Sequence, residues 1–181
     1  MCAINKIVTR SYNTVGGGAN TNLNGLEFER GTDLREAFAN HPQYKLSGDS
    51  IIDRTTQEVV GRLYEKNKLY KNLLEANHIN YKNIISKKLL PDDALVVGNT
   101  LYIIEKKYQA GAGSVDEKLQ TCHFKKRQYI KLMTSLGLEV QFYYLLSDWF
   151  NAPSYKDVLD YIEEVGCKYF FGKIPLEKLG L

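Results

Sequence analysis

The 181 residues of this chain are 44% hydrophobic and 25% charged, a composition typical of a globular protein with a core of its own. No apolar run approaches the ~20 residues of a membrane-spanning helix, and residues 1–10 are too few and too polar for a signal peptide. The net charge of +3 does not by itself indicate a nucleic-acid-binding protein.

The cysteines and histidines argue against a zinc site. The three cysteines, Cys2, Cys122 and Cys167, include no CxxC pair, and the three histidines are scattered without metal-ligand spacing. An odd number of cysteines without such a pair is typical of reduced thiols in the cytoplasm. We therefore expect a cytoplasmic protein that has neither a disulfide framework nor a zinc site.

The N-terminal part combines a polar loop with a short helix. Residues 1–24 are expected to be a flexible segment, because the glycines and asparagines of residues 16–25 are typical of a mobile loop. Residues 33–40 then predict a helix, which ends at His41-Pro42 because the residue before a proline disfavours helical geometry.

A longer amphipathic helix is expected over residues 55–77. Thr55 and Glu58 fit the capping box that begins many helices. An apolar stripe of roughly helical spacing follows, and basic residues occupy the opposite face. The stripe consists of Val59, Leu63, Tyr70 and Leu74.

Residues 91–107 predict a β-hairpin with charged ends. Two apolar runs flank Gly98-Asn99, a pair typical of a two-residue hairpin turn. Folding at this turn brings the Asp92-Asp93 end of the first strand beside Glu105 at the end of the second.

Strand alternation divides the charges that end the hairpin. Glu105 and Lys107 share one face of the strand, and Lys106 takes the other. Two carboxylates that converge without a cation repel each other, and all-oxygen ligands suit Mg²⁺. A lysine two residues further on can stabilise the negative charge that develops on a phosphate. The pattern therefore predicts a magnesium-dependent reaction at a phosphate.

The rest of the chain alternates helices and strands. Ser114 and Glu117 form a second capping box before a long helix that ends at Gly137. A buried strand is expected over 139–146, followed by a helix from Pro153, a short strand at 168–171 and a docked apolar tail at 174–181. We expect an α/β fold in a single domain, with a central mixed sheet flanked by helices.

Pro91-Asp92 and Glu105-x-Lys107 resemble the motif of the PD-(D/E)xK nuclease superfamily. The resemblance implies a restriction-endonuclease-like fold over 1–181, in which residues 91–146 supply the catalytic hairpin, helix and strand. It implies Asp92 and Glu105 as Mg²⁺ ligands and Lys107 as the activating cation. The family pattern favours the acid directly after the proline, whereas the residues alone leave Asp92 and Asp93 open, because a strand end can bulge.

Two further catalytic candidates come from the same resemblance. Glu29 lies in a Gly-x-x-Phe-Glu segment like one on the first helix of such nucleases, where the glutamate helps to hold a water at the metal. Glu27 is the alternative, and both are also explained by a helix start, where the helix dipole favours acids. Gln109, two residues beyond Lys107, corresponds to a position near the scissile phosphate, or else is a polar loop residue.

The helix after the hairpin is the expected DNA-binding element. Five basic residues and no acidic one occur between positions 118 and 138, and a glycine-rich loop precedes them. A solvated helix face is the ordinary explanation, but phosphate contact is favoured beside a phosphodiesterase centre. The loop lacks the Gly-Lys-Ser/Thr of ATP-binding proteins. The DNA-binding candidates are Ser114, Lys118, Lys125, Lys126, Arg127 and Lys131.

The sequence around the motif resembles that of type II restriction endonucleases. It resembles most the small catalytic subunits of heterodimeric type IIS enzymes, whose large partner recognises the site and nicks the other strand. The resemblance thus implies double-stranded DNA and a large subunit as partners. The alternatives are a homodimeric type II restriction enzyme, a structure-specific repair nuclease or junction resolvase, and a DNA-binding module without catalysis.

Overall fold

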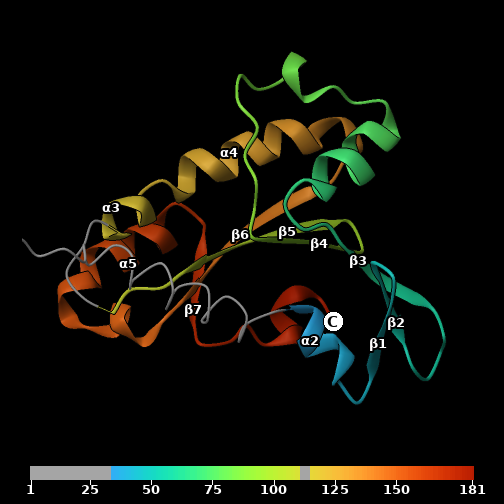
Figure 1. The fold of residues 1–181 in the computed structure, drawn as a ribbon. Coiled ribbons are helices and arrows are strands. Elements are labelled where there is room, and N and C mark those ends of the chain that lie inside the picture. Colours follow the sequence, from blue (N-terminus) through green and yellow to red (C-terminus); the bar gives the residue numbers. More distant parts are fainter. Residues whose placement is uncertain (1–33, 111–114) are drawn as a thin grey trace, which may run out of the picture.

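The computed structural model describes residues 34–110 and 115–181, and these form a mixed α/β structure around one seven-stranded sheet (Figure 1). The strands lie side by side in the order in which they occur in the chain. Strands β1 to β5 are antiparallel, and β5, β6 and β7 are parallel. The strands are β1 (Tyr44–Ser47), β2 (Ser50–Asp53), β3 (Val59–Leu63), β4 (Asp93–Val97), β5 (Thr100–Lys107), β6 (Glu139–Leu146) and β7 (Lys168–Phe171).

Helices cover both faces of the sheet. The α-helices are α2 (Leu34–Ala39), α3 (Val115–Leu119), α4 (Cys122–Met133) and α5 (Lys156–Glu164), and a π-helix, η1, spans Leu69–Leu74. Short 3₁₀ turns are Glu75–Asn77, Tyr81–Asn83, Thr134–Leu136, Asp148–Asn151, Pro153–Tyr155 and Leu176–Leu179. None of the helices in this part of the chain is long and apolar enough to cross a membrane.

Two separate hydrophobic cores lie on the two faces of the sheet. Along β6, Phe142 and Tyr144 pack with α4, α5 and η1, whereas Tyr143 and Leu145 pack with α2 and the C-terminal tail. The same alternation runs along β5, where Ile103 belongs to the first core and Ile104 to the second. We refer to these faces as the α4 face and the α2 face.

The expected helix over residues 55–77 is wrong for its first half. The Asp53 carboxylate accepts the backbone N–H groups of Thr55 and Thr56, which makes a turn where a helix start was expected. Strand β3 follows and pairs with both β2 and β4. At its centre, a Cβ on Gly61 would lie 2.9 Å from the carbonyl oxygen of Val96, so the close strand pairing requires glycine there. The helical pattern is realised only from Leu69, in η1.

The hairpin and the crossover after it follow the sequence prediction. Val97 pairs with Thr100 across the turn at Gly98-Asn99. The Asn99 side chain donates to the carbonyl of Gly137 at 3.0 Å, and the Asn99 carbonyl accepts the N–H of Glu139 at 2.9 Å. These bonds fix the start of β6 beside the hairpin turn.

The long helix expected after Ser114 is interrupted between α3 and α4. At the break the Thr121 hydroxyl donates to the Lys118 carbonyl at 2.7 Å, and the Tyr144 hydroxyl shares its proton between the carbonyls of Lys118 and Leu119 at 3.1 and 3.2 Å. The last expected elements are confirmed. The α5 helix and β7 occur where predicted, and Ile174 and Leu179 are buried in the tail, as expected for a docked segment.

Candidate functional site

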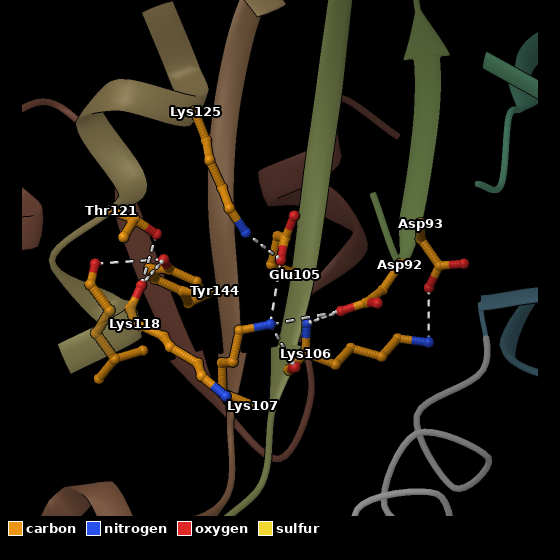
Figure 2. Close-up of polar contacts among 10 residues, drawn as sticks. Asp92, Asp93, Glu105, Lys106, Lys107, Lys118, Thr121, Lys125 and Tyr144 are labelled. Carbon is orange, nitrogen blue, oxygen red and sulfur yellow. Dashed lines mark hydrogen bonds and ion pairs between the residues drawn. The ribbon is translucent and has the colours of Figure 1, made fainter. Parts of the chain in front are cut away.

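The charged C-terminal end of β5 lies between α4 and the start of the neighbouring strand β4. Glu105 and Lys107 point to the α4 face, and Lys106 points to the α2 face, as strand alternation predicted (Figure 2). Parallel pairing with β6 holds this segment on one side, and on the other side the Lys106 N–H donates to the Asp92 carboxylate. The strand therefore sorts its charged side chains into two clusters.

Glu105 is a buried carboxylate held by two amines. Its side chain is only 7% exposed, and its Oε2 atom accepts from Lys107 Nζ at 3.1 Å and from Lys125 Nζ at 2.8 Å. Burial of a carboxylate costs roughly several kcal/mol unless a neighbouring cation or hydrogen bonds compensate its charge. The ammonium groups of Lys107 and Lys125 supply this compensation.

Asp92 completes the cluster from the residue before β4. Its Oδ2 atom accepts the backbone N–H of Lys106 at 2.7 Å and lies 3.8 Å from Lys107 Nζ. Lys107 Nζ also donates to the carbonyl oxygen of Lys106 at 3.0 Å. One ammonium group is thus surrounded by oxygens of three residues, namely Asp92, Glu105 and the Lys106 backbone (Figure 2).

Asp93 belongs to a different pair on the α2 face. Its carboxylate lies 2.7 Å from Lys106 Nζ, and both side chains are 7% exposed. Of the two acids that the residues alone left open, the structure brings Asp92 beside Glu105 and Lys107, and it brings Asp93 to Lys106. Strand pleat is the physical reason, because adjacent residues at a strand end point to opposite faces.

The other predicted catalytic residues fall outside this cluster or outside the described residues. Glu27 and Glu29 lie outside the described residues, as does the whole segment 1–24. Gln109 follows the end of β5 and is buried, with its backbone N–H donating to Ser147 Oγ at 3.3 Å. Its contact with a phosphate stays a prediction.

The DNA-binding candidates divide into three groups. Ser114 is outside the described residues. Lys118, Arg127 and Lys131 are exposed on α3 and α4. Lys125 and Lys126 are committed to the protein itself: Lys125 contacts Glu105, and Lys126 Nζ donates to the Gly166 carbonyl at 2.5 Å.

Two residues of α4 line the cluster although the sequence did not predict them there. Lys125 was predicted only as a DNA contact. Lys125 and Tyr129 are four positions apart and therefore lie one turn apart on the inward face of the helix. The helical spacing from Cys122 could have placed Lys125 on that face. Burial raises the pKa of the Tyr129 hydroxyl, and the nearby carboxylates of Glu105 and Asp92 raise it further, so the hydroxyl stays protonated.

The donor set of the cluster suits a hard divalent cation. Carboxylate and carbonyl oxygens are the ligands that Mg²⁺ prefers, and Mg²⁺ commonly takes one or two carboxylates while substrate phosphates and waters fill the rest of its shell. Within the described residues no group of three or more Asp, Glu, His or Cys side chains gathers. Asp92 and Glu105 would therefore hold the ion as a pair, with the Lys106 carbonyl as the third oxygen.

Comparisons with known proteins do not assign this chain to a family. No protein-family model matches it, and a search of curated proteins found no match.

The two faces of β5 predict opposite effects for two adjacent lysines. Lys106→Met should lower the free energy of unfolding by about 3–5 kcal/mol, because it removes the ammonium group that lies 2.7 Å from the buried Asp93 carboxylate. Lys107→Met should cost less, about 1–2 kcal/mol, since Lys125 still neutralises Glu105. Urea unfolding measures both values. Equal losses would contradict the division into two clusters.

Removal of the Tyr129 hydroxyl should be nearly neutral for stability. This hydroxyl is buried and has no hydrogen-bond partner among the described residues, so Tyr129→Phe should change the free energy of unfolding by less than about 0.5 kcal/mol, or raise it. Tyr144→Phe is the matched control and should cost about 1 kcal/mol or more, because the Tyr144 hydroxyl bonds two carbonyls. Thermal or urea unfolding compares the two variants, and a large loss for Tyr129→Phe alone would reveal a partner for its hydroxyl.

Proposed function

We propose that this chain is a Mg²⁺-dependent endonuclease that hydrolyses a phosphodiester bond of double-stranded DNA. The observation that carries the proposal is the convergence of Asp92, Glu105 and the Lys106 carbonyl on one ammonium group, that of Lys107. Asp92, Glu105 and Lys107 are the residues that the PD-(D/E)xK resemblance implies. The same arrangement of oxygens around one cation suits a metal ion.

The order of elements supports a restriction-endonuclease-like fold. In that proposal the antiparallel hairpin of β4 and β5 brings Asp92, just before β4, and Glu105, on β5, to the site, and α4 crosses over to the parallel strand β6. The site then lies at the end of β5 under α4, where a phosphate can approach from solvent. Side-chain exposures of 26% for Asp92 and 24% for Lys125 support access from that side.

Each residue has a distinct task in the proposed reaction. Asp92 and Glu105 would hold Mg²⁺, and a bound Mg²⁺ would polarise the phosphate and make an attacking water more acidic. Lys107 keeps an ammonium group beside that water and beside the negative charge that develops on the phosphate oxygens. The N–H of Lys106 orients the Asp92 carboxylate, so the backbone of β5 takes part in positioning the ligands.

The exposed basic residues of α3 and α4 are the proposed contacts with the DNA backbone. Lys118, Arg127 and Lys131 are free to meet phosphates, whereas Lys126 anchors α4 to the loop before β7. Such contacts hold the duplex in register and add binding energy that falls with salt concentration.

We further propose that the chain is the cleavage subunit of a pair. The described strands join one sheet, and the described helices pack on it, so this part of the chain contains no second unit to read bases. A large partner subunit would recognise the sequence and nick the other strand.

Neutralising Glu105 should strongly slow cleavage and leave DNA binding intact. Glu105→Gln should slow Mg²⁺-dependent cleavage about a hundred- to a thousandfold, because it removes a metal ligand and its charge. Duplex binding in Ca²⁺ should persist. The assay is gel analysis of plasmid DNA incubated with this chain and the proposed large partner subunit.

Glu139→Gln is the matched control, since Glu139 is an exposed glutamate at the start of the adjacent strand β6. Its rate should equal that of the wild type. Wild-type cleavage by Glu105→Gln would refute the assignment of the site.

The pair arrangement predicts that the chain alone cuts poorly. With Mg²⁺ and plasmid, the isolated chain should leave the DNA intact, and addition of the partner should restore cleavage at a defined site. Native mass spectrometry should show a monomer without the partner. Linear plasmid from the chain alone, together with a dimer mass, would instead favour the homodimeric enzyme, and preference for branched DNA would favour a junction nuclease.

A further inference from the structure

Lys125 reaches the site from a different element than the motif residues. It projects from the first half of α4, and its Nζ atom lies 2.8 Å from Glu105 Oε2, closer than Lys107 Nζ at 3.1 Å (Figure 2). The motif itself requires only Lys107. The structure thus contains a second cation on the carboxylate oxygen that would ligate the metal.

The two lysines are not equivalent in their surroundings. Lys107 Nζ is surrounded by oxygens of Glu105, Lys106 and Asp92, and its side chain is 16% exposed. The contact of Lys125 with Glu105 is its one ion pair among the described residues, and its side chain is 24% exposed. A long, flexible lysine held by one contact can withdraw into solvent at lower cost than one held by three.

We propose that Lys125 is an internal competitor of the divalent cation for Glu105. Without metal, its ammonium group neutralises the buried carboxylate and keeps it in place. When a divalent cation binds, Lys125 leaves Glu105 and is available to a phosphate oxygen of the substrate. Lys125 is thus a positioning residue, and this inference depends on the proposed metal site at Glu105.

Removal of the Lys125 charge should therefore change both the affinity for a divalent cation and the stability of the protein. Lys125→Gln should bind a divalent cation more tightly, because the cation no longer displaces an ammonium group. The same variant should be less stable in EDTA, because the buried Glu105 carboxylate keeps one amine instead of two. Added metal should then stabilise the variant more than the wild type, as expected for a ligand that binds only the folded state.

Calcium titration of the DNA-free chain tests the proposal. Isothermal titration calorimetry with Ca²⁺ should show roughly fivefold or tighter binding for Lys125→Gln, at the lower end of usual coupling between sites. Thermal unfolding in EDTA and in Ca²⁺ should show a lower midpoint for the variant in EDTA and a larger rise with Ca²⁺. Addition of Glu105→Gln to either protein should remove the Ca²⁺ binding.

Lys126→Gln is the matched control. It removes the same charge from the next position of α4, but Lys126 donates to the Gly166 carbonyl and not to Glu105. Its Ca²⁺ affinity should equal that of the wild type. A gain as large as that of Lys125→Gln would mean that only the net charge of the helix matters, and would overturn the proposal.

The remaining outcomes separate the two proposals. Equal Ca²⁺ affinity in the wild type and Lys125→Gln, lost in both with Glu105→Gln, would overturn the role of Lys125 and leave the metal site standing. Ca²⁺ binding that Glu105→Gln does not affect, or no Ca²⁺ binding by any variant, would overturn the metal site, and the role of Lys125 with it.

Discussion

Strand β5 pairs with β6 along its whole length and with β4 as far as Ile104, and this pairing sets the direction of the side chains that it carries. Because the pleat alternates, three consecutive charged residues at its end serve two faces of the sheet. Glu105 and Lys107 enter the cluster under α4, and Lys106 enters the core under α2. A slip of the register by one residue would exchange these roles and bury the wrong charges.

Charge balance is the second constraint on this region. Three carboxylates, those of Asp92, Asp93 and Glu105, meet three ammonium groups, those of Lys106, Lys107 and Lys125. On the α2 face the Asp93–Lys106 pair is buried, with both side chains 7% exposed. On the α4 face the two amines are partly exposed, with side-chain exposures of 16% for Lys107 and 24% for Lys125. The same kind of ion pair is therefore buried on one side of the strand and partly open to solvent on the other.

The correct and incorrect predictions of secondary structure have one physical explanation. The hairpin at Gly98-Asn99 and strand β6 carry strong local signals, namely a turn pair and a continuous apolar run, and both occur as predicted. The helix over 55–77 also had local signals, but β3 is stabilised by β2 on one side and β4 on the other. Pairing with strands distant in the chain outweighed a capping box and a helical stripe.

For the site, local sequence alone determined which residues of the hairpin end share a face, because strand alternation depends only on position in the chain. It predicted Glu105 and Lys107 together, and Lys106 apart. Only the tertiary structure decided that Asp92 and not Asp93 joins them, and that Lys125 and Tyr129 of α4 line the same cluster. Those contacts depend on how α4 packs across β5 and on where β4 begins, and both are set by the core as a whole.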